Sequence, residues 1–163
     1  MNIASFIGMA AMTVGALMLG GLYKGYLLRG QAELEEYLSF LKHLRRRVSL
    51  DAEPYSVASA SFEGKMLLEN GFLLYIREGL APKDALDKSL CHGSVSEKER
   101  ELIRAALGEI GKNALPDELK TADGHISLIE DELRARREEN DKRIKSSYAV
   151  ILAVTLGICI LLL

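Results

Sequence analysis

The stretch QAELEEYLSFLKHLRRRVSL, residues 31–50, carries the clearest helical pattern in this chain. Its apolar residues recur at intervals of three and four, which places them on one face of an α-helix. These residues are Leu34, Tyr37, Leu38, Leu41, Leu44 and Val48. Glutamates stand at the start of the stretch and arginines at its end, an order that the helix macrodipole favours. We therefore expect an amphipathic helix whose apolar face packs against other helices.

The segment before this helix is apolar. Residues 3–23 contain no charged side chain, and about 20 apolar residues suffice for a helix to cross about 30 Å of hydrocarbon. A cleaved signal peptide is the alternative, but signal peptides carry positive charge ahead of their apolar core. Here the first cations, Lys24 and Arg29, follow the apolar run. We therefore expect a retained transmembrane helix in residues 1–23.

Small residues recur within this expected span. They are Ala4, Gly8, Ala11 and Gly15. Small residues at such spacing let helix backbones approach closely in lipid, although glycine is also common in membrane helices generally. If the pattern marks a contact, the expected partner is the C-terminal apolar segment or another membrane protein.

The chain ends on a second uncharged segment, residues 146–163. At 1.5 Å per residue it extends about 27 Å as a helix, just enough for a thin crossing. A buried core helix is the alternative, but Lys142, Arg143 and Lys145 stand directly before the segment, where lipid headgroups would lie. We therefore expect a second transmembrane helix. Because cations flank the segment 24–145 at both ends, the positive-inside rule predicts a cytoplasmic middle with both termini on the far side.

All 21 Lys and Arg and all 23 Asp and Glu lie in this middle segment, and the net charge is −2. This near balance argues against a strongly basic nucleic-acid-binding module. The two cysteines, Cys91 and Cys159, lie in different environments, so free thiols are favoured over a disulfide. No metal site is expected, since Cys91-His92 has no second Cys/His pair at ligand spacing.

Two proline-started helices are expected in the first half of the middle segment. Pro54 suits the first position of a helix over about residues 55–70, which Gly71 weakens. A short helix then closes at Gly79 and directs apolar side chains toward a core, and Pro82 starts another helix. Those apolar side chains are Leu73, Leu74, Ile76 and Leu80.

Two longer helices complete the middle segment. Ser96 and Glu99 form a capping-box pattern that opens the first of them. The second begins near Pro116, carries an apolar heptad stripe and has no breaker before the C-terminal apolar segment. The stripe consists of Leu119, Ala122, Ile126, Ile129 and Leu133. With no alternating strand pattern, the sequence predicts an all-α fold: a membrane-anchored antiparallel helical bundle over residues 24–145 with one N-terminal and one C-terminal transmembrane helix.

No residue pattern indicates a catalytic, cofactor or metal site. The chain has no phosphate-binding Gly loop, no nucleophile elbow and no HExxH motif, and its histidines, His43, His92 and His125, are scattered. Acidic groups such as Asp117-Glu118 are more typical of solvated faces and helix starts than of acid–base pairs. We therefore expect a protein that is not an enzyme.

Clusters of charge are the candidate partner-docking residues. The run from Arg45 to Arg47 is either a solvated helix end or a contact surface. A second charged flank lies on the last helix. The candidate docking residues are Arg45, Arg46, Arg47, Arg134, Arg136, Arg137 and Glu138.

The order of these segments is similar to that of a known family. The similarity is carried by ELEEYLSFLKHLRRRV, EPYSVASASF, LLYIREGLAPKDALDKSL and LIRAALGEIG, and most specifically by NDKRIKS at the entry to the terminal apolar tail. Over nearly its whole length the chain resembles the stage III sporulation protein AB family of endospore-forming bacteria. It departs from the family at Leu107-Gly108, where Phe-Gly is commoner, and at Thr121-Ala122, where the family more often has Gln.

The resemblance implies a domain similar to the helical domain of the inner-membrane platform protein of type II secretion and type IV pilus systems. It implies a structural membrane subunit of the secretion-like channel between mother cell and forespore, needed for endospore formation and placed in the mother-cell membrane around the forespore. The implied partners are a cytosolic secretion-type ATPase and other membrane subunits of the channel. The two expected spans add membrane lipid as a partner, and a second copy of the chain is a further candidate. A generic two-span membrane adaptor or regulator is the alternative that the residues leave open.

Overall fold

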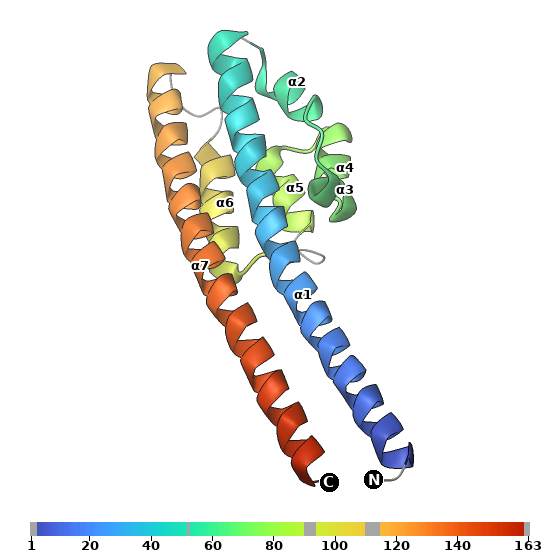
Figure 1. The fold of residues 1–163 in the computed structure, drawn as a ribbon. Coiled ribbons are helices and arrows are strands. Elements are labelled where there is room, and N and C mark those ends of the chain that lie inside the picture. The colour runs from blue at the N-terminus through green and yellow to red at the C-terminus, as the bar shows by residue number, and fades with distance from the viewer. Residues whose placement is uncertain (1–2, 52, 90–93, 110–114, 162–163) are drawn as a thin grey trace. The chain divides into compact units, whose positions relative to one another are not determined.

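The computed structural model describes residues 3–51, 53–89, 94–109 and 115–161. The regular elements in these ranges are all α-helices, so the all-α prediction is confirmed (Figure 1). The helices are α1 (Ile3–Leu50), α2 (Tyr55–Ala60), α3 (Lys65–Glu69), α4 (Phe72–Arg77), α5 (Pro82–Ser89), α6 (Glu97–Glu109) and α7 (Leu115–Leu161).

The chain divides into two compact units. The bundle unit comprises Arg29–Ala135, and the arm unit comprises Met1–Leu28 together with Arg136–Leu163. The long helices α1 and α7 each contribute to both units, whereas α2 to α6 belong to the bundle unit alone.

α1 supplies much of the core of the bundle unit. Every residue of its predicted apolar stripe, from Leu34 to Val48, is buried. Phe40, outside that stripe, is buried as well, because its ring packs edge-on against Phe72 of α4 and Phe62, at centroid distances of 5.2 and 5.3 Å. Tyr37 meets Phe72 in the same way at 5.3 Å. Neighbouring segments therefore bury a wider part of the surface of α1 than its apolar stripe alone indicates.

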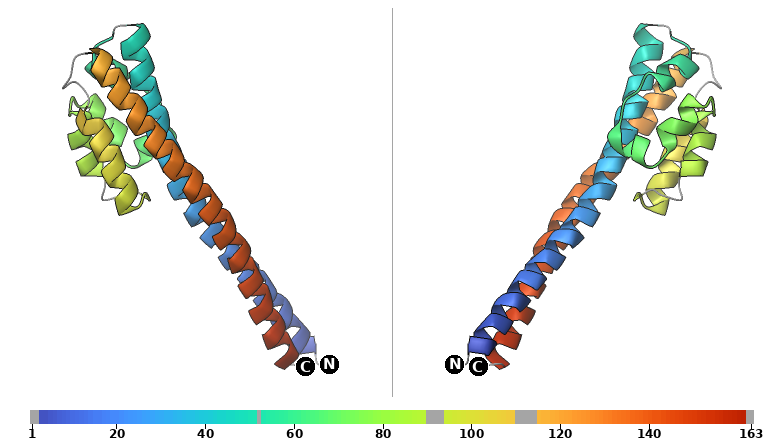
Figure 2. Two further views of the ribbon diagram at one scale, coloured as in Figure 1. Left: turned by 90° about the vertical axis from the view of Figure 1, so that its left-hand side faces the viewer. Right: turned by 90° about the vertical axis from the view of Figure 1, so that its right-hand side faces the viewer.

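α7 lies antiparallel to α1 within the bundle unit, and α2 to α6 gather on one side of this pair (Figure 2). Ion pairs join the two long helices, from Lys42 to Glu130 at 2.6 Å and from Arg45 to Asp123 at 2.7 Å. Three members of the predicted heptad stripe are buried and two are half-buried. The buried members are Ile126, Ile129 and Leu133, and the half-buried ones are Leu119 and Ala122. As predicted, α7 continues unbroken into the C-terminal apolar segment.

The predicted capping box opens α6. The backbone N–H of Ser96 donates to Oε2 of Glu99 at 2.6 Å, and the N–H of Glu99 donates to Oγ of Ser96 at 3.4 Å. Backbone N–H groups at a helix start have no partner within the helix, so these side chains supply the missing acceptors. α6 accordingly begins at Glu97, directly after Ser96.

The prediction of one helix over residues 55–70 is wrong, because the structure divides this segment into α2 and α3. Gly64, before α3, has an extended backbone with φ −151° and ψ 132°. The carboxylate of Glu36 on α1 accepts a hydrogen bond from the N–H of Leu67 at 3.0 Å and so caps the start of α3. A side chain that is 31 residues away in sequence thus begins a helix for which the local sequence has no cap.

Two glycines with positive φ bound α4. Gly71 (φ 88°) precedes the helix and Gly79 (φ 90°) follows it, a conformation that other residues rarely adopt. Leu73 and Ile76 are buried, as predicted. The predicted burial of Leu74 is wrong, because this side chain is 50% exposed. A helix of six residues that packs along one side turns the neighbour of a buried residue outward.

The arm unit consists of the first part of α1 and the last part of α7, which touch each other. Nδ2 of Asn140 donates to the carbonyl oxygen of Leu27 at 3.4 Å. Gly20 is buried, and a methyl group added there would lie 3.0 Å from the Tyr148 ring and 3.2 Å from Ile151. The missing side chain at Gly20 therefore permits the close approach of the two helices.

The predicted stripe of small residues does not form this contact. Among the described residues, no neighbouring group lies within 4 Å of the position that a Cβ would take at Gly8 or Gly15, and Ala11 is exposed. The side chain of Ala4 lies outside the described part of the structure. In the described residues, the C-terminal segment instead packs on Gly20, which is not part of the predicted stripe.

α1 is long and apolar enough to cross a membrane, judged by its length and composition. Among the residues that the structure describes, it is the one helix that meets both measures. These measures alone do not separate a retained span from a signal sequence near an N-terminus.

Replacing Gly64 by alanine should destabilise the bundle unit. A Cβ at this position would lie 2.7 Å from Oε2 of Glu36 and 2.9 Å from the Phe62 ring, so the carboxylate would leave the N–H of Leu67. We expect a loss of about 1–3 kcal/mol in the free energy of unfolding, measured by chemical denaturation of the full chain in detergent.

Gly124→Ala is the matched control, because Gly124 lies within α7 with open space around it, and it should stabilise by about 0.5–1 kcal/mol. In a Glu36→Ala background the cost of Gly64→Ala should shrink. An unchanged cost there would mean that the clash with Glu36 is not its cause.

Candidate functional site

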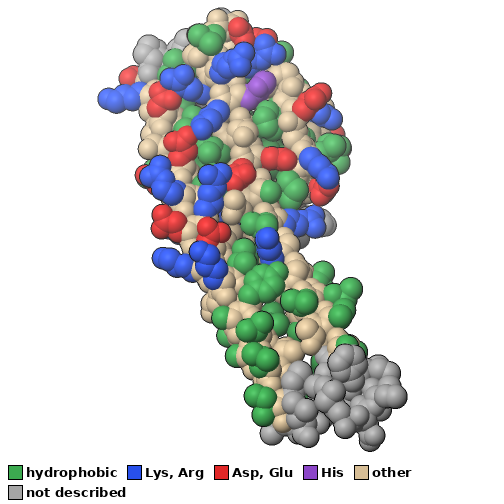
Figure 3. Space-filling view, in the orientation of Figure 1, with side chains coloured by type: hydrophobic (Ala, Val, Ile, Leu, Met, Phe, Trp, Pro, Cys, Tyr) green, Lys and Arg blue, Asp and Glu red, His purple; other side chains and the backbone are tan. Residues whose placement is uncertain are grey.

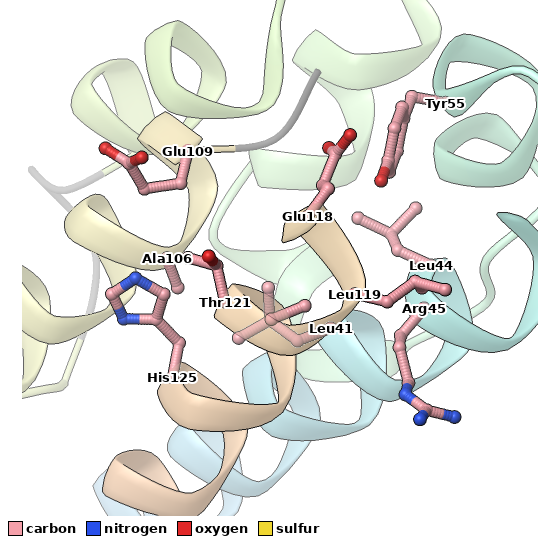
Figure 4. Close-up of a pocket in the computed structure, with 11 residues that line it drawn as sticks. Leu41, Leu44, Arg45, Tyr55, Ala106, Glu109, Glu118, Leu119, Thr121 and His125 are labelled. Atoms are coloured by element: carbon pink, nitrogen blue, oxygen red, sulfur yellow. The ribbon is translucent and has the colours of Figure 1, made fainter. Parts of the chain in front are cut away.

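A small pocket lies in the bundle unit between α1, α2, α6 and α7 (Figure 4). Its volume of about 30 Å³ has room for about two water molecules, whereas ligand sites typically measure roughly 300–1,000 Å³. It is lined by Leu41, Leu44, Arg45, Tyr55, Ala106, Glu109, Glu118, Leu119, Thr121, Ala122 and His125. A substrate or cofactor of ordinary size does not fit in it.

Tyr55 and Glu118 form a polar pair in the wall of this pocket (Figure 4). The hydroxyl of Tyr55 donates a hydrogen bond to the buried carboxylate of Glu118. Burial, and next the hydrogen bond and charge of Glu118, raise the pKa of Tyr55. This hydrogen bond joins the start of α2 to the first turn of α7.

The sequence anticipated Glu118 in part. It lies in the first turn of α7, where the helix dipole stabilises a carboxylate, so its prediction as a helix-start charge is confirmed. Its predicted solvation is wrong, because Glu118 is buried under Tyr55 and the neighbouring helices.

The histidines do not form a common site in the described residues. Nε2 of His43 lies 3.2 Å from the carbonyl oxygen of Ala58 and 3.0 Å from Oγ of Ser61, so this ring ties α1 to the end of α2. His125 lines the pocket, and His92 lies outside the described residues. In the ranges that the structure describes, no group of three or more His, Cys, Asp or Glu side chains is placed to hold a metal ion.

A buried polar cluster joins α1 to the segment between α3 and α4. Glu33 is 2% exposed, and its Oε1 accepts a hydrogen bond from Nδ2 of Asn70 at 2.8 Å. The same amide lies 3.2 Å from the hydroxyl of Tyr37, and the N–H of Ser94 donates to the other carboxylate oxygen of Glu33. Oδ1 of Asn70 in turn accepts the N–H of Phe72 at 3.0 Å. Each of these groups satisfies another, as buried polar groups must.

Burial sets the protonation state of Tyr37 in this cluster. Burial raises the pKa of Tyr37 to about 12, with the charge of Glu33 acting in the same direction. Hydrogen bonds from Ser89 and Asn70 and the charge of Arg100 act against it. The sequence holds one signal for this cluster, since Glu33 stands four residues before Tyr37 and so shares its helix face.

Two of the three arginines in the predicted docking run are paired within the chain. Arg45 forms a bidentate pair with Asp123, from Nε at 2.7 Å and from Nη2 at 3.0 Å, and this pair raises the pKa of Arg45. Nη1 of Arg47 lies 3.1 Å from Oδ2 of Asp51. Arg46 is exposed and forms no ion pair with a described residue. Arg46 is therefore the member of the run best placed to meet a partner.

The second predicted cluster is divided between the two units. Arg134 belongs to the bundle unit and lies 3.5 Å from Asp131. Arg136, Arg137 and Glu138 belong to the arm unit, and both arginines interact with other groups of the chain. The structure therefore does not show the predicted docking residues as one surface.

Comparison with family models, with curated proteins and with solved structures finds no match for this chain. Function must therefore be argued from the sequence pattern and from the geometry of the described residues. That geometry comprises a pocket of water size, buried polar groups that join helices, and an exposed arginine at the end of α1.

Tyr37→Phe should flatten the loss of stability at high pH. Because the folded-state pKa of Tyr37 is about 12 and that of an unfolded tyrosine is about 10, its contribution is complete below pH 10 and is lost as the pH rises toward 12. The loss should amount to about 2–3 kcal/mol for the wild-type chain.

Thermal unfolding of the full chain at pH 9 and pH 11.5, followed by circular dichroism, measures this difference. Replacing the exposed Tyr26 by phenylalanine is the control and should leave the wild-type pH dependence in place. Equal losses in the Tyr37→Phe variant and the wild type would rule out this role for Tyr37.

Proposed function

We propose that the chain is a structural membrane subunit, in which two transmembrane helices of the arm unit hold the bundle unit at the cytoplasmic face of a bilayer. In this proposal the subunit belongs to the secretion-like channel between mother cell and forespore and docks a cytosolic secretion-type ATPase. The membrane attachment is supported by the exposed side chains of the arms, and the identity of the assembly by the resemblance of the sequence.

Large apolar side chains are exposed along both arms, and this is the observation that carries the proposal. On α1 they are Met12, Val14, Leu17, Met18, Leu19, Leu22, Tyr23, Tyr26 and Leu28, and on α7 they are Tyr148, Val150, Leu152, Val154, Leu156 and Ile160. Contiguous apolar surface of this kind is rare on proteins surrounded by water and normal on helices surrounded by lipid.

The two units differ in surface chemistry. On the face seen in Figure 3, Lys, Arg, Asp and Glu side chains alternate over the bundle unit, whereas hydrophobic side chains cover the described part of the arms. The described helix from residue 146 to Leu161 would extend about 24 Å, which suits a thin crossing. These features support a second span beside the one in α1.

The cations next to the arms support the proposed orientation. Lys24 follows the apolar part of α1, and Lys142 and Lys145 precede the apolar part of α7. Residues 3–23 and 146–163 themselves carry no charge. By the positive-inside rule, the bundle unit therefore faces the cytoplasm, where an ATPase has access to it.

The interior of the bundle unit supports a structural rather than a catalytic role. The pocket is too small for a substrate, and Tyr55 and Glu118 in its wall form a hydrogen bond with each other. Arg46 offers an exposed charge for an acidic surface of the ATPase, while Arg45 and Arg47 stabilise the end of α1.

Membrane attachment and orientation can be measured together in cells. The full chain should remain with the membrane after extraction at alkaline pH, because two apolar helices hold it. A Ser127→Cys variant that lacks Cys91 and Cys159 should react with a membrane-impermeant maleimide only after permeabilisation, since Ser127 is exposed on the bundle unit. Extraction by alkali would contradict the anchor, and labelling in intact cells would contradict the orientation.

Arg46→Glu should reduce capture of the secretion-type ATPase by the tagged full chain about tenfold, because a contact charge would be reversed. Lys120→Glu is the control, since Lys120 is an exposed cation of the bundle unit that forms no ion pair with a described residue. Capture that survives Arg46→Glu unchanged would remove Arg46 from the docking surface. Failure of the wild-type chain to capture the ATPase would favour the two-span adaptor or regulator.

A further inference from the structure

We infer that the end of α1 receives an acidic amphipathic helix of the secretion-type ATPase, with Arg46 binding a carboxylate of that helix and Leu50 covering one of its apolar side chains. This inference rests on the function proposed above and adds the chemistry of the partner surface. It is carried by the exposure of Leu50, by its place on α1 next to Arg46, and by the contacts that fix this end of the helix.

Leu50 is more exposed than the other large apolar side chains in the described part of the bundle unit. It is the last residue of α1, and 75% of it is exposed. Even Leu22 of the arm unit, which the proposed function places in lipid, is 72% exposed. Single exposed leucines are common on proteins surrounded by water, so Leu50 marks a contact only if a second feature lies beside it.

Arg46 is that second feature. It stands four positions before Leu50, so the two side chains lie on one face of α1, about 6 Å apart along the helix. Both are exposed, and Arg46 forms no ion pair with a described residue. Arginine is enriched at protein interfaces, and the apolar area of Leu50 supplies the burial that a charge alone does not provide.

The neighbouring helices leave this face of α1 uncovered. At about 100° per residue, Arg45 and His43 lie on opposite sides of Arg46 around the helix. Nε of Arg45 lies 2.7 Å from Oδ1 of Asp123 on α7, and Nε2 of His43 lies 3.2 Å from a backbone carbonyl oxygen of α2. α7 and α2 therefore flank α1, and Arg46 and Leu50 face outward between them.

Contacts within the chain fix the end of α1. Nη1 of Arg47 lies 3.1 Å from Oδ2 of Asp51 and 3.3 Å from Oε1 of Glu53. The carbonyl oxygen of Arg47 also accepts the N–H groups of these two residues, at 3.0 and 3.4 Å. Oγ of Ser49 donates to the carbonyl oxygen of Arg46 at 3.2 Å. A partner therefore meets a backbone that is already ordered, which reduces the entropy lost on binding.

The spacing of Arg46 and Leu50 specifies the partner surface. A guanidinium pairs best with a carboxylate, and an exposed leucine is removed from water by another apolar side chain. These two groups of the partner must also lie about 6 Å apart, which is the separation of side chains three or four positions apart on a helix. An amphipathic helix with an aspartate or glutamate beside its apolar stripe meets both requirements.

The test measures capture of the purified ATPase by the tagged full chain in non-ionic detergent. Leu50→Ala should weaken capture about tenfold, because the apolar side chain of the partner would then stay in contact with water. Arg46→Gln should also weaken capture at about 0.05 M salt, and its effect should shrink at about 0.5 M salt, where charges are screened. The loss caused by Leu50→Ala should persist at the higher salt concentration.

Leu128→Ala is the matched control, because Leu128 is a leucine of the bundle unit on α7 that is 54% exposed. This variant should capture the ATPase as the wild type does. Leu50→Met should retain capture as well, since methionine keeps most of the apolar area. Circular dichroism shows whether each variant keeps its helices.

Undiminished capture by Leu50→Ala would overturn the inference and leave the proposed function intact, because the ATPase would then bind elsewhere on the chain. Equal losses in Leu50→Ala and Leu128→Ala would also overturn it, since the effect would belong to any exposed leucine. A loss in Leu50→Ala that disappears at high salt would contradict the apolar contact. Failure of the wild-type chain to capture the ATPase would refute the proposed docking itself, and this inference with it.

Discussion

Burial of the amphipathic half of α1 is the interaction on which the bundle unit depends. From Leu34 to Val48 this helix buries its apolar stripe, and each large side chain removed from water contributes about 1.5–3 kcal/mol. Phe40 extends the buried surface around the helix, because Phe62 and Phe72 pack edge-on against it. Helices as short as α2, α3 and α4 are not stable alone, so packing against this surface of α1 is what stabilises them.

The polar contacts of α1 decide where those short helices begin and end. Glu36 caps α3, and Glu33 holds Asn70, whose own side chain accepts the first N–H of α4. These carboxylates are costly to bury without partners, so each one also penalises any arrangement in which the segment shifts along α1. Apolar burial thus supplies the stability of the unit, and the glutamates supply its register.

The two long helices, α1 and α7, present different surfaces in the two units. In the bundle unit α1 and α7 turn apolar side chains inward and join their surfaces by ion pairs such as Lys42–Glu130. In the arm unit the same helices leave large apolar side chains exposed and touch at Gly20, which a lipid environment would permit and water would not. This contrast, rather than any reactive group, supports the proposal of an anchored structural subunit.

The sequence by itself determined the features that depend on near neighbours. Helical periodicity identified the buried face of α1 and the stripe of α7, and Ser96 with Glu99 identified the start of α6, because these contacts join residues three or four positions apart. The structure alone decided the break near Gly64, the burial of Glu33 and Glu118, the exposure of Leu74 and the contact at Gly20. Each of these depends on which distant helix lies opposite, and no local pattern specifies that neighbour. For the same reason, the sequence does not indicate which candidate docking arginines are paired within the chain. In the structure, Arg45 forms an ion pair with Asp123, and Arg47 forms one with Asp51.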